Sequence, residues 1–184
     1  GTAGRRRGGG ARPPLPSVSP GTAHADMSIR TPPPILVFGW GNPSRGDDAL
    51  GPLFIDALAG RALPGVECLT DFQLQVEHAL DLRDRQRVLF VDASVDVGHP
   101  FEVSTVLPAR DTSFTTHAVS PQVVLSVFED LERCPPPPST LLAIRGEQWA
   151  LGTEPSPQAM ARLAAALDWA QAWCTTSPPA PEGG

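Results

Sequence analysis

The chain has 184 residues, with 20 acidic and 14 basic side chains and a formal net charge of −6. Residues 1–30 hold five arginines and one acidic residue, so the remainder carries 14 − 5 = 9 basic and 20 − 1 = 19 acidic side chains, a net charge of −10. A surface this acidic repels a phosphate backbone, which argues against nucleic acid as a partner.

The cysteines indicate a reducing compartment. Cys68, Cys134 and Cys174 are odd in number and form no C-x-x-C pair, which argues against a disulfide framework and against a thiolate zinc site. No apolar run reaches the ~18 residues that cross a bilayer, and the N-terminal segment lacks the apolar centre of a signal peptide. We therefore expect a cytoplasmic protein that does not enter a membrane.

The length suits a single domain with a core of its own. Residues 1–34 are rich in Gly, Pro, Ser and Arg and have little to bury, so they are predicted to be a disordered extension, with Met27 as an alternative start. Residues 35–176 are predicted to form one α/β domain, and residues 177–184 a flexible tail. Four prolines at 135–138 predict a stiff connector within the domain.

Short apolar runs alternate with longer amphipathic runs along the predicted domain. The short runs predict strands at residues 35–38, 66–70, 87–91, 101–107 and 140–145, the fourth of them at a sheet edge. The longer runs predict helices at 49–63, 74–83, 121–133 and 156–174, the last with Ser156 as N-cap and Pro157 in its first position. Alternating strands and helices predict an α/β three-layer sandwich, a mostly parallel sheet with helices on both faces.

The loop after the first predicted strand resembles two phosphate-binding motifs and fulfils neither. It begins a G-x-G-x-x-G pattern, but Ser44 occupies the position of the third glycine. Gly41 and Gly46 have the spacing of a nucleotide-binding loop, but Asp47 and Asp48 follow where Lys and Ser or Thr are required. Two carboxylates repel a nucleotide, so the loop favours a cation.

Three potential metal ligands are predicted to lie at one edge of the sheet. Asp48 lies in the loop after the first strand, Asp92 follows the strand RVLFV, and His117 precedes the helix that begins near Pro121. The loops at the carboxyl ends of parallel strands converge in one crevice. Two carboxylates and one imidazole suit a borderline transition metal and leave coordination positions open.

Each ligand also has an ordinary structural interpretation. Asp47 or Asp48 can cap the helix that follows. Asp92 can be a loop aspartate after a buried strand, and a lone histidine such as His117 is more often a surface residue. Spacing alone leaves these alternatives open.

The order of the motifs resembles a known family. A strand followed by G-x-G-N and G-D-D-x-x-G, then V-D-A after a buried strand, then T-T-H before a helix, is similar to the maturation endopeptidases of nickel-iron hydrogenases. The resemblance covers residues 35–174. The stretches DFQLQVEHALDL at 71–82, HAVSPQVVL at 117–125 and IRGEQWALG at 144–152 resemble the branch that processes soluble, NAD-linked hydrogenases.

The resemblance implies a sheet flanked by helices and an enzyme that removes the C-terminal tail of the hydrogenase large-subunit precursor after nickel insertion. It implies that Asp48, Asp92 and His117 are catalytic and contact the nickel, which the precursor supplies. Some relatives have Glu in place of Asp48 and a His in place of Gln122. The protein is expected to act as a monomer, with no nucleic acid and no other cofactor.

The segment 73–82 is a candidate second contact surface for the precursor. Its Glu77 and His78 belong to one of the branch-like stretches, although a solvated helix face explains them as well.

Two other functions fit parts of the sequence. A non-enzymatic, metal-dependent chaperone that binds the same precursor would use the same ligands. A nucleotide-binding oxidoreductase would need glycine at Ser44 and a ribose-binding acid about 20 residues further on, and Glu67 and Asp71 lie too far along the chain.

Overall fold

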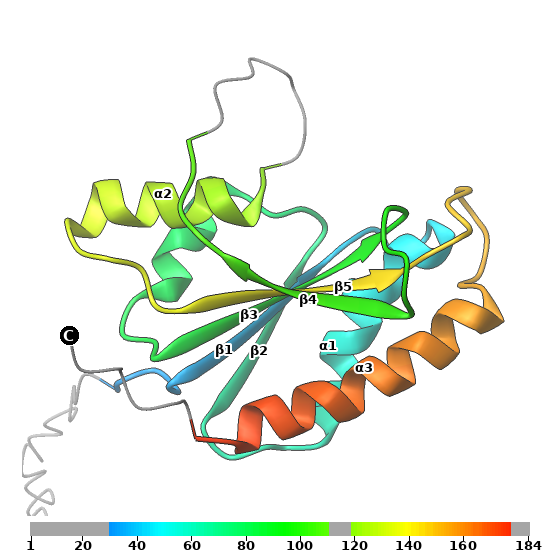
Figure 1. Ribbon diagram of the computed structural model, residues 1–184, viewed down its shortest axis with the longest axis horizontal. Helices are drawn as coiled ribbons and strands as arrows, with labels where there is room; N and C mark the ends of the chain where they lie inside the picture. Colours follow the sequence, from blue (N-terminus) through cyan, green and yellow to red (C-terminus); the bar gives the residue numbers. More distant parts are fainter. Residues whose placement is uncertain (1–29, 111–118, 178–184) are drawn as a thin grey trace, which may run out of the picture. The chain divides into compact units, whose positions relative to one another are not determined.

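The computed structural model describes residues 30–110 and 119–177 (Figure 1). The chain divides into two compact units, residues 1–30 and residues 31–184, and the fold described here is that of the second. Most of the predicted N-terminal extension, the predicted tail beyond residue 177 and the T-T-H segment with His117 lie outside the described residues. The single peptidase domain at residues 35–176 therefore stays a prediction.

A five-stranded sheet forms the centre of the unit, in the order β2-β1-β3-β5-β4. The first four strands in this order are parallel, and β4 runs antiparallel to β5 at the edge. The strands are β1 (Ile35–Trp40), β2 (Val66–Asp71), β3 (Arg87–Ser94), β4 (Phe101–Val106) and β5 (Ser139–Arg145). The prediction of a mostly parallel sheet with an edge strand near residue 101 is confirmed.

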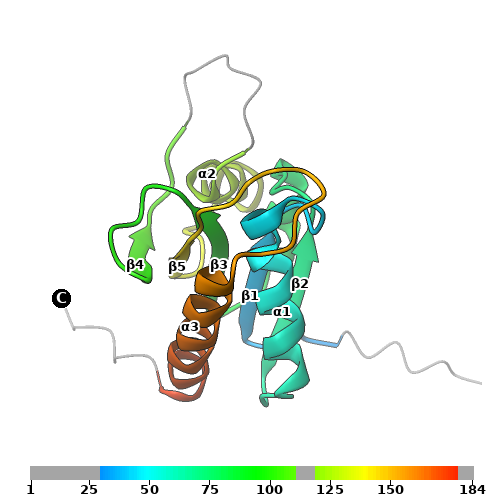
Figure 2. The same cartoon turned by 90° about the vertical axis from the view of Figure 1, so that its right-hand side faces the viewer.

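Helices cover both faces of the sheet, as predicted (Figures 1 and 2). They are α1 (Leu50–Gly60), α2 (Pro121–Glu132) and α3 (Pro157–Thr175), with two 3-10 helices, η1 (Gly46–Ala49) and η2 (Val76–Leu82). Side chains alternate between the faces of the central strand β1: Ile35 and Val37 join the core with α1 and α3, whereas Leu36 and Phe38 join the core with η2 and α2. Burial on both faces explains the continuous apolar run of this strand.

Capping residues fix where two of the helices begin. At α3, the hydroxyl of Ser156 accepts a hydrogen bond from the backbone N–H of Ala159 at 3.2 Å, and Pro157 occupies the first turn, as predicted. At α2, Ser120 plays the same part and Pro121 opens the helix. No helix within residues 30–110 and 119–177 combines the length and the hydropathy needed to cross a membrane.

Two predicted elements differ from the observed ones. The helix predicted at residues 74–83 is the 3-10 helix η2, in which the buried Ala79 and Leu82 are three positions apart, the spacing at which side chains align in this tighter helix. The strand predicted to end at Val91 continues to Ser94. Asp92 therefore lies within β3, opposite Ala143 of β5.

Two glycines allow α1 to lie unusually close to β1. A Cβ on Gly39 would lie 2.7 Å from Cγ1 of Ile55 and 2.8 Å from the carbonyl oxygen of Gly51, and a Cβ on Gly51 would overlap the carbonyl oxygen of Trp40. The first turns of α1 thus touch the end of β1. This contact sets the position of the loop at residues 41–49, which joins the two elements.

Gly51→Ala should lower the free energy of unfolding by about 1 to 3 kcal/mol, because backbone atoms on both sides leave no room for a methyl group. Gly60→Ala in the same helix is the matched control: its Cβ would meet nothing within 4 Å, so stability should stay unchanged or rise by up to about 1 kcal/mol. Urea unfolding measures both. Equal stability of the two variants would contradict the close packing of α1 on β1.

Candidate active site at the carboxyl edge of the sheet

The loops that follow β1, β2, β3 and β5 meet at the carboxyl edge of the sheet. The β1 loop leads into η1, and the β5 loop, residues 146–155, leads into α3. Figure 2 shows the β5 loop passing beside η1. Both predicted carboxylate ligands, Asp48 and Asp92, belong to this edge, as does the buried Asp47, which directly precedes Asp48.

Asp47 is fully buried, and backbone and hydroxyl donors of the β5 loop surround its carboxylate. Oδ2 accepts hydrogen bonds from the N–H groups of Glu147 at 2.6 Å and Gln148 at 3.0 Å, and from the hydroxyl of Ser156 at 2.9 Å. Oδ1 accepts the N–H of Ser156 at 2.6 Å. Burial acts to raise the pKa of Asp47, but these donors together outweigh it and hold the pKa below its ordinary value.

Backbone hydrogen bonds tie the same two loops together. The N–H of Gly46 donates to Thr153 O at 3.0 Å, that of Asp47 to Gln148 O at 2.7 Å, and that of Gly152 to Ser44 O at 2.7 Å. The loops thus form one hydrogen-bonded unit. The stretch IRGEQWALG, noted in the sequence only for its resemblance, supplies most of the partners of Asp47.

Neither aspartate caps the helix that follows it. No side chain makes a capping hydrogen bond at the start of η1 or of α1, so the capping interpretation of Asp47 and Asp48 is wrong. Asp47 instead binds Ser156, the N-cap of α3. Sequence reasoning missed this role because the partners are backbone groups about 100 residues away.

Asp48 is half-buried and bonds to the loop that follows β1. Its Oδ2 accepts the backbone N–H of Asn42 at 2.9 Å. Gly41 is required for this turn, because its φ of 148° is disfavoured for other residues and a Cβ there would overlap the carbonyl oxygen of Asp48. The carboxylate of Asp48 is therefore held over the end of β1.

Asp92 reaches the same edge from β3, against which η1 lies. Its Oδ1 accepts the N–H of Ala93 at 2.8 Å. Burial raises the pKa of Asp92 to about 7; the N–H of Ala93 opposes this shift, and the negative charge of Asp48 adds to it. Asp48 in η1 and Asp92 in β3 thus belong to two elements that contact each other.

His117, the third predicted ligand, lies outside the described residues. Among residues 30–110 and 119–177, no three or more His, Cys, Asp or Glu side chains gather as a metal site. The described part of the chain brings together two of the three predicted ligands, and the complete site with His117 remains a prediction.

A histidine and aspartate pair at the end of β2 corrects one sequence interpretation. The Nε2 of His78 lies 3.2 Å from Oδ2 of Asp71, and its Nδ1 accepts the N–H of Gln75 at 2.9 Å. This pair joins η2 to the end of β2. Its ring packs on Phe38 with 4.5 Å between centroids, and the side chain is only 15% exposed. A solvated helix face was one explanation for Glu77 and His78, but only Glu77 is exposed.

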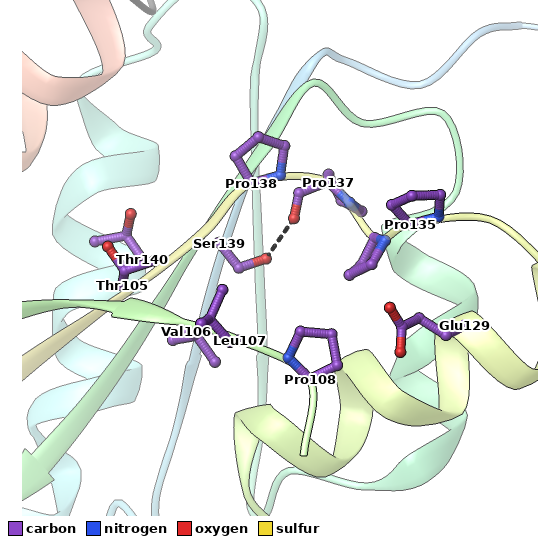
Figure 3. A pocket seen from close by; sticks show the side chains of 11 residues that line it. Thr105, Val106, Leu107, Pro108, Glu129, Pro135, Pro137, Pro138, Ser139 and Thr140 are labelled. Atoms are coloured by element: carbon purple, nitrogen blue, oxygen red, sulfur yellow. Dashed lines mark hydrogen bonds between the residues drawn. The ribbon is translucent and has the colours of Figure 1, made fainter. Parts of the chain in front are cut away.

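Two hollows lie at opposite edges of the sheet. One, of about 340 Å³, adjoins the loop that holds Asp48 and is lined by Gly41, Pro43, Pro52, Thr70, Asp71 and Phe72. The other, of about 440 Å³, lies between the end of β4 and the prolines that precede β5 (Figure 3). There the hydroxyl of Ser139 donates to Pro137 O at 2.9 Å. Despite its larger volume, this second hollow lies far from both carboxylates and is not the candidate site.

The fold is similar to that of solved NiFe hydrogenase maturation proteases. HycI from Thermococcus kodakarensis KOD1 superposes with a TM-score of 0.64 at 22% identity over 80% of this chain and 96% of its own. HybD from Escherichia coli gives 0.58 at 24% identity over 76% and 90%. An endopeptidase from Escherichia coli gives 0.59 at 26% identity over 75% and 90%.

No protein-family model and no curated protein matches the sequence. At these identities the likeness shows the α/β fold, and the activity is taken up as a proposal below.

Asp47→Asn should lower the free energy of unfolding by about 2 to 4 kcal/mol. The NH2 group of asparagine would face a buried backbone N–H and cannot accept its hydrogen bond. Asp56→Asn, at an exposed position of α1, should change it by less than about 0.5 kcal/mol. The difference, measured by urea unfolding, should shrink as the pH falls below 3.8, where the lowered pKa of Asp47 no longer favours the folded state. Equal unfolding midpoints at pH 7 would show that the cluster does not hold the loops.

Asp92→Asn should make the protein increasingly more stable than the wild type as the pH rises from 5 to 8. The folded state raises the pKa of Asp92 from 3.8 to about 7, so its favourable contribution is present at acid pH and is lost as the pH approaches 7. The full change is on the order of 2 to 4 kcal/mol. Asparagine has no such titration and can still accept the N–H of Ala93. Parallel curves of stability against pH for the two proteins would contradict the shift.

Proposed function

We propose that the protein is an endopeptidase that removes the C-terminal tail of a nickel-iron hydrogenase large-subunit precursor after nickel has been inserted. The observation that supports the proposal is the position of Asp48 in η1 and Asp92 in β3, two elements that contact each other at the carboxyl edge of this fold. The likeness to solved hydrogenase maturation proteases supports it. The V-D-A and T-T-H motifs add Asp92 and His117 to the proposed catalytic set.

The donor types suit the recognition of a bound metal ion. Two carboxylates from Asp48 and Asp92 and an imidazole from His117 are ligands that nickel accepts, and three ligands leave positions for groups of the precursor. Nickel would enter as part of the precursor, so an empty precursor would lack the feature that the site recognises. Such an ion supplies Lewis-acid polarisation of a carbonyl group or of water.

The reaction is hydrolysis of one peptide bond. Water adds to the scissile carbonyl carbon, the C–N bond breaks, and the products are a new carboxylate on the large subunit and a free amine on the tail. Asp48 and Asp92 are held in place by backbone N–H groups of Asn42 and Ala93, so they would meet the precursor without rearranging. The hollow of about 340 Å³ beside Asp48 offers an apolar surface for side chains near the cleaved bond.

The remaining features of the proposal come from the sequence. The stretches at 71–82, 117–125 and 144–152 favour a soluble, NAD-linked hydrogenase as the source of the precursor. Cysteine usage favours the cytoplasm, and the protein is proposed to act as a monomer whose catalytic domain spans residues 35–176.

Asp48→Asn and His117→Ala should each lower the rate of tail removal from a nickel-loaded precursor by at least about 100-fold, because each removes a group proposed to contact the metal. Asp56→Asn and His99→Ala change exposed residues and should cut normally. The mass of the large subunit after incubation gives the readout, with circular dichroism to check folding.

Nickel-free precursor should stay uncut under the same conditions. Normal processing by Asp48→Asn or His117→Ala would overturn the residue assignment. If the wild type binds the nickel-loaded precursor and leaves its mass unchanged, the endopeptidase proposal is wrong and a metal-dependent chaperone takes its place.

A further inference from the structure

The strand β2 lies at an edge of the sheet and points some of its backbone N–H and C=O groups away from the other strands. Its partner β1 lies on one side only. The N–H of Ile35 donates to Gly65 O at 3.1 Å and the N–H of Gly41 to Asp71 O at 3.2 Å. Since alternate residues of a parallel strand bond to the same neighbour, Val66, Cys68 and Thr70 point their N–H and C=O groups outward.

Two hollows lie along this strand, on the face that α1 covers. One, of about 310 Å³, lies between β2 and the second half of α1 and includes Leu58, Ala62, Val66 and Cys68. The other, of about 340 Å³, includes Thr70 at the end of β2 and Pro52 in the first turn of α1. Figure 2 shows α1 running beside β2, with the outer edge of β2 facing away from the other strands.

The spacing of the hollows matches an extended chain. Val66 and Thr70 are four residues apart, about 13 Å at the rise of a β-strand. Side chains four positions apart on an added strand point to the same face at that distance. The second hollow includes Gly41, next to Asn42, whose N–H holds the carboxylate of Asp48. A chain lying along β2 would therefore reach the candidate site directly.

We propose that β2 binds the C-terminal tail of the precursor as a sixth strand, which places two apolar side chains of the tail in the hollows beside α1. This inference rests on the proposed function. Strand addition gives affinity through main-chain hydrogen bonds and selectivity through pockets for alternate side chains. The three outward residues offer three donors and three acceptors, so one short extended segment satisfies them all.

Charge argues for a segment of the precursor over a second copy of this chain. Residues 31–184 carry a net charge of −10, and Asp71 at the end of β2 keeps a side chain that is 39% exposed. Two such edges would repel each other. An uncharged or basic segment fits the edge, and self-association through β2 is an outcome that the experiment below excludes.

The opposite edge, β4, provides an internal comparison. The N–H of Arg145 donates to Pro100 O at 3.1 Å, so by the alternation of antiparallel pairing Phe101, Val103 and Thr105 point their backbone groups away from β5. The hollow near β4 lies at the edge of the sheet opposite to β2. A strand that led into that hollow would leave the candidate site empty.

Residue-resolved amide hydrogen exchange with a synthetic peptide of the whole tail of the precursor tests the inference. Exchange at Val66, Cys68 and Thr70 should slow at least about 10-fold at saturating peptide, and exchange at Phe101, Val103 and Thr105 should not change. Slowing at β4, equal slowing at both edges, or no slowing at either would overturn the proposal. Slowing at β2 that follows protein concentration without peptide would show pairing of two copies and would overturn it as well.

A matched pair of proline variants tests the same edge during cleavage. Thr70→Pro and Thr105→Pro each remove an outward N–H and leave the hydrogen bonds to the neighbouring strand in place. Thr70→Pro should raise KM for the nickel-loaded precursor about 10-fold with kcat within about twofold of the wild type, and Thr105→Pro should change neither. Equal KM values for the two variants would overturn the proposal. If Thr70→Pro fails to fold, the exchange experiment on the unaltered protein decides.

The inference and the proposed function fail in different ways. A wild-type protein that leaves the nickel-loaded precursor uncut contradicts the function, whereas the peptide experiment still reports on the edge of β2. Normal cleavage together with unchanged exchange at β2 contradicts strand addition alone.

Discussion

The buried carboxylate of Asp47 is the interaction on which the carboxyl edge of the sheet depends. A charge in the interior is tolerated only when hydrogen bonds replace its lost water, and here four donors from Glu147, Gln148 and Ser156 do so. These hydrogen bonds hold the β5 loop against η1. Asp47 is held in the interior, whereas its neighbour Asp48 is half-buried and accepts the N–H of Asn42 just after β1.

The elements that were predicted correctly are those whose signals are local. The apolar run of β1 and the Ser156 and Pro157 pair at the start of α3 needed only neighbouring residues to be recognised. Features that depend on distant groups could not be predicted in this way. Asp47 is satisfied by backbone donors far along the chain, and the side chain of His78 is mostly covered where its ring packs on Phe38 of β1.

The candidate site was predicted in part for the same reason. Parallel strands bring their carboxyl ends together, so Asp48 and Asp92 could be assigned to one edge from the order of the elements alone. How deeply each is buried depends on packing between elements, which the sequence does not reveal. That burial sets the proton affinity of Asp92.

The hydroxyl of Ser156 links the loop that contains Asp47 to the start of α3. It donates to Asp47 and accepts from Ala159 of α3, while α3 packs on α1 and α1 continues covalently into η1, which contains Asp47. A loop inside a closed circuit of this kind cannot swing independently of the helices behind it. If the proposed precursor docks here, its own chain end would therefore have to be the pliable component of the complex.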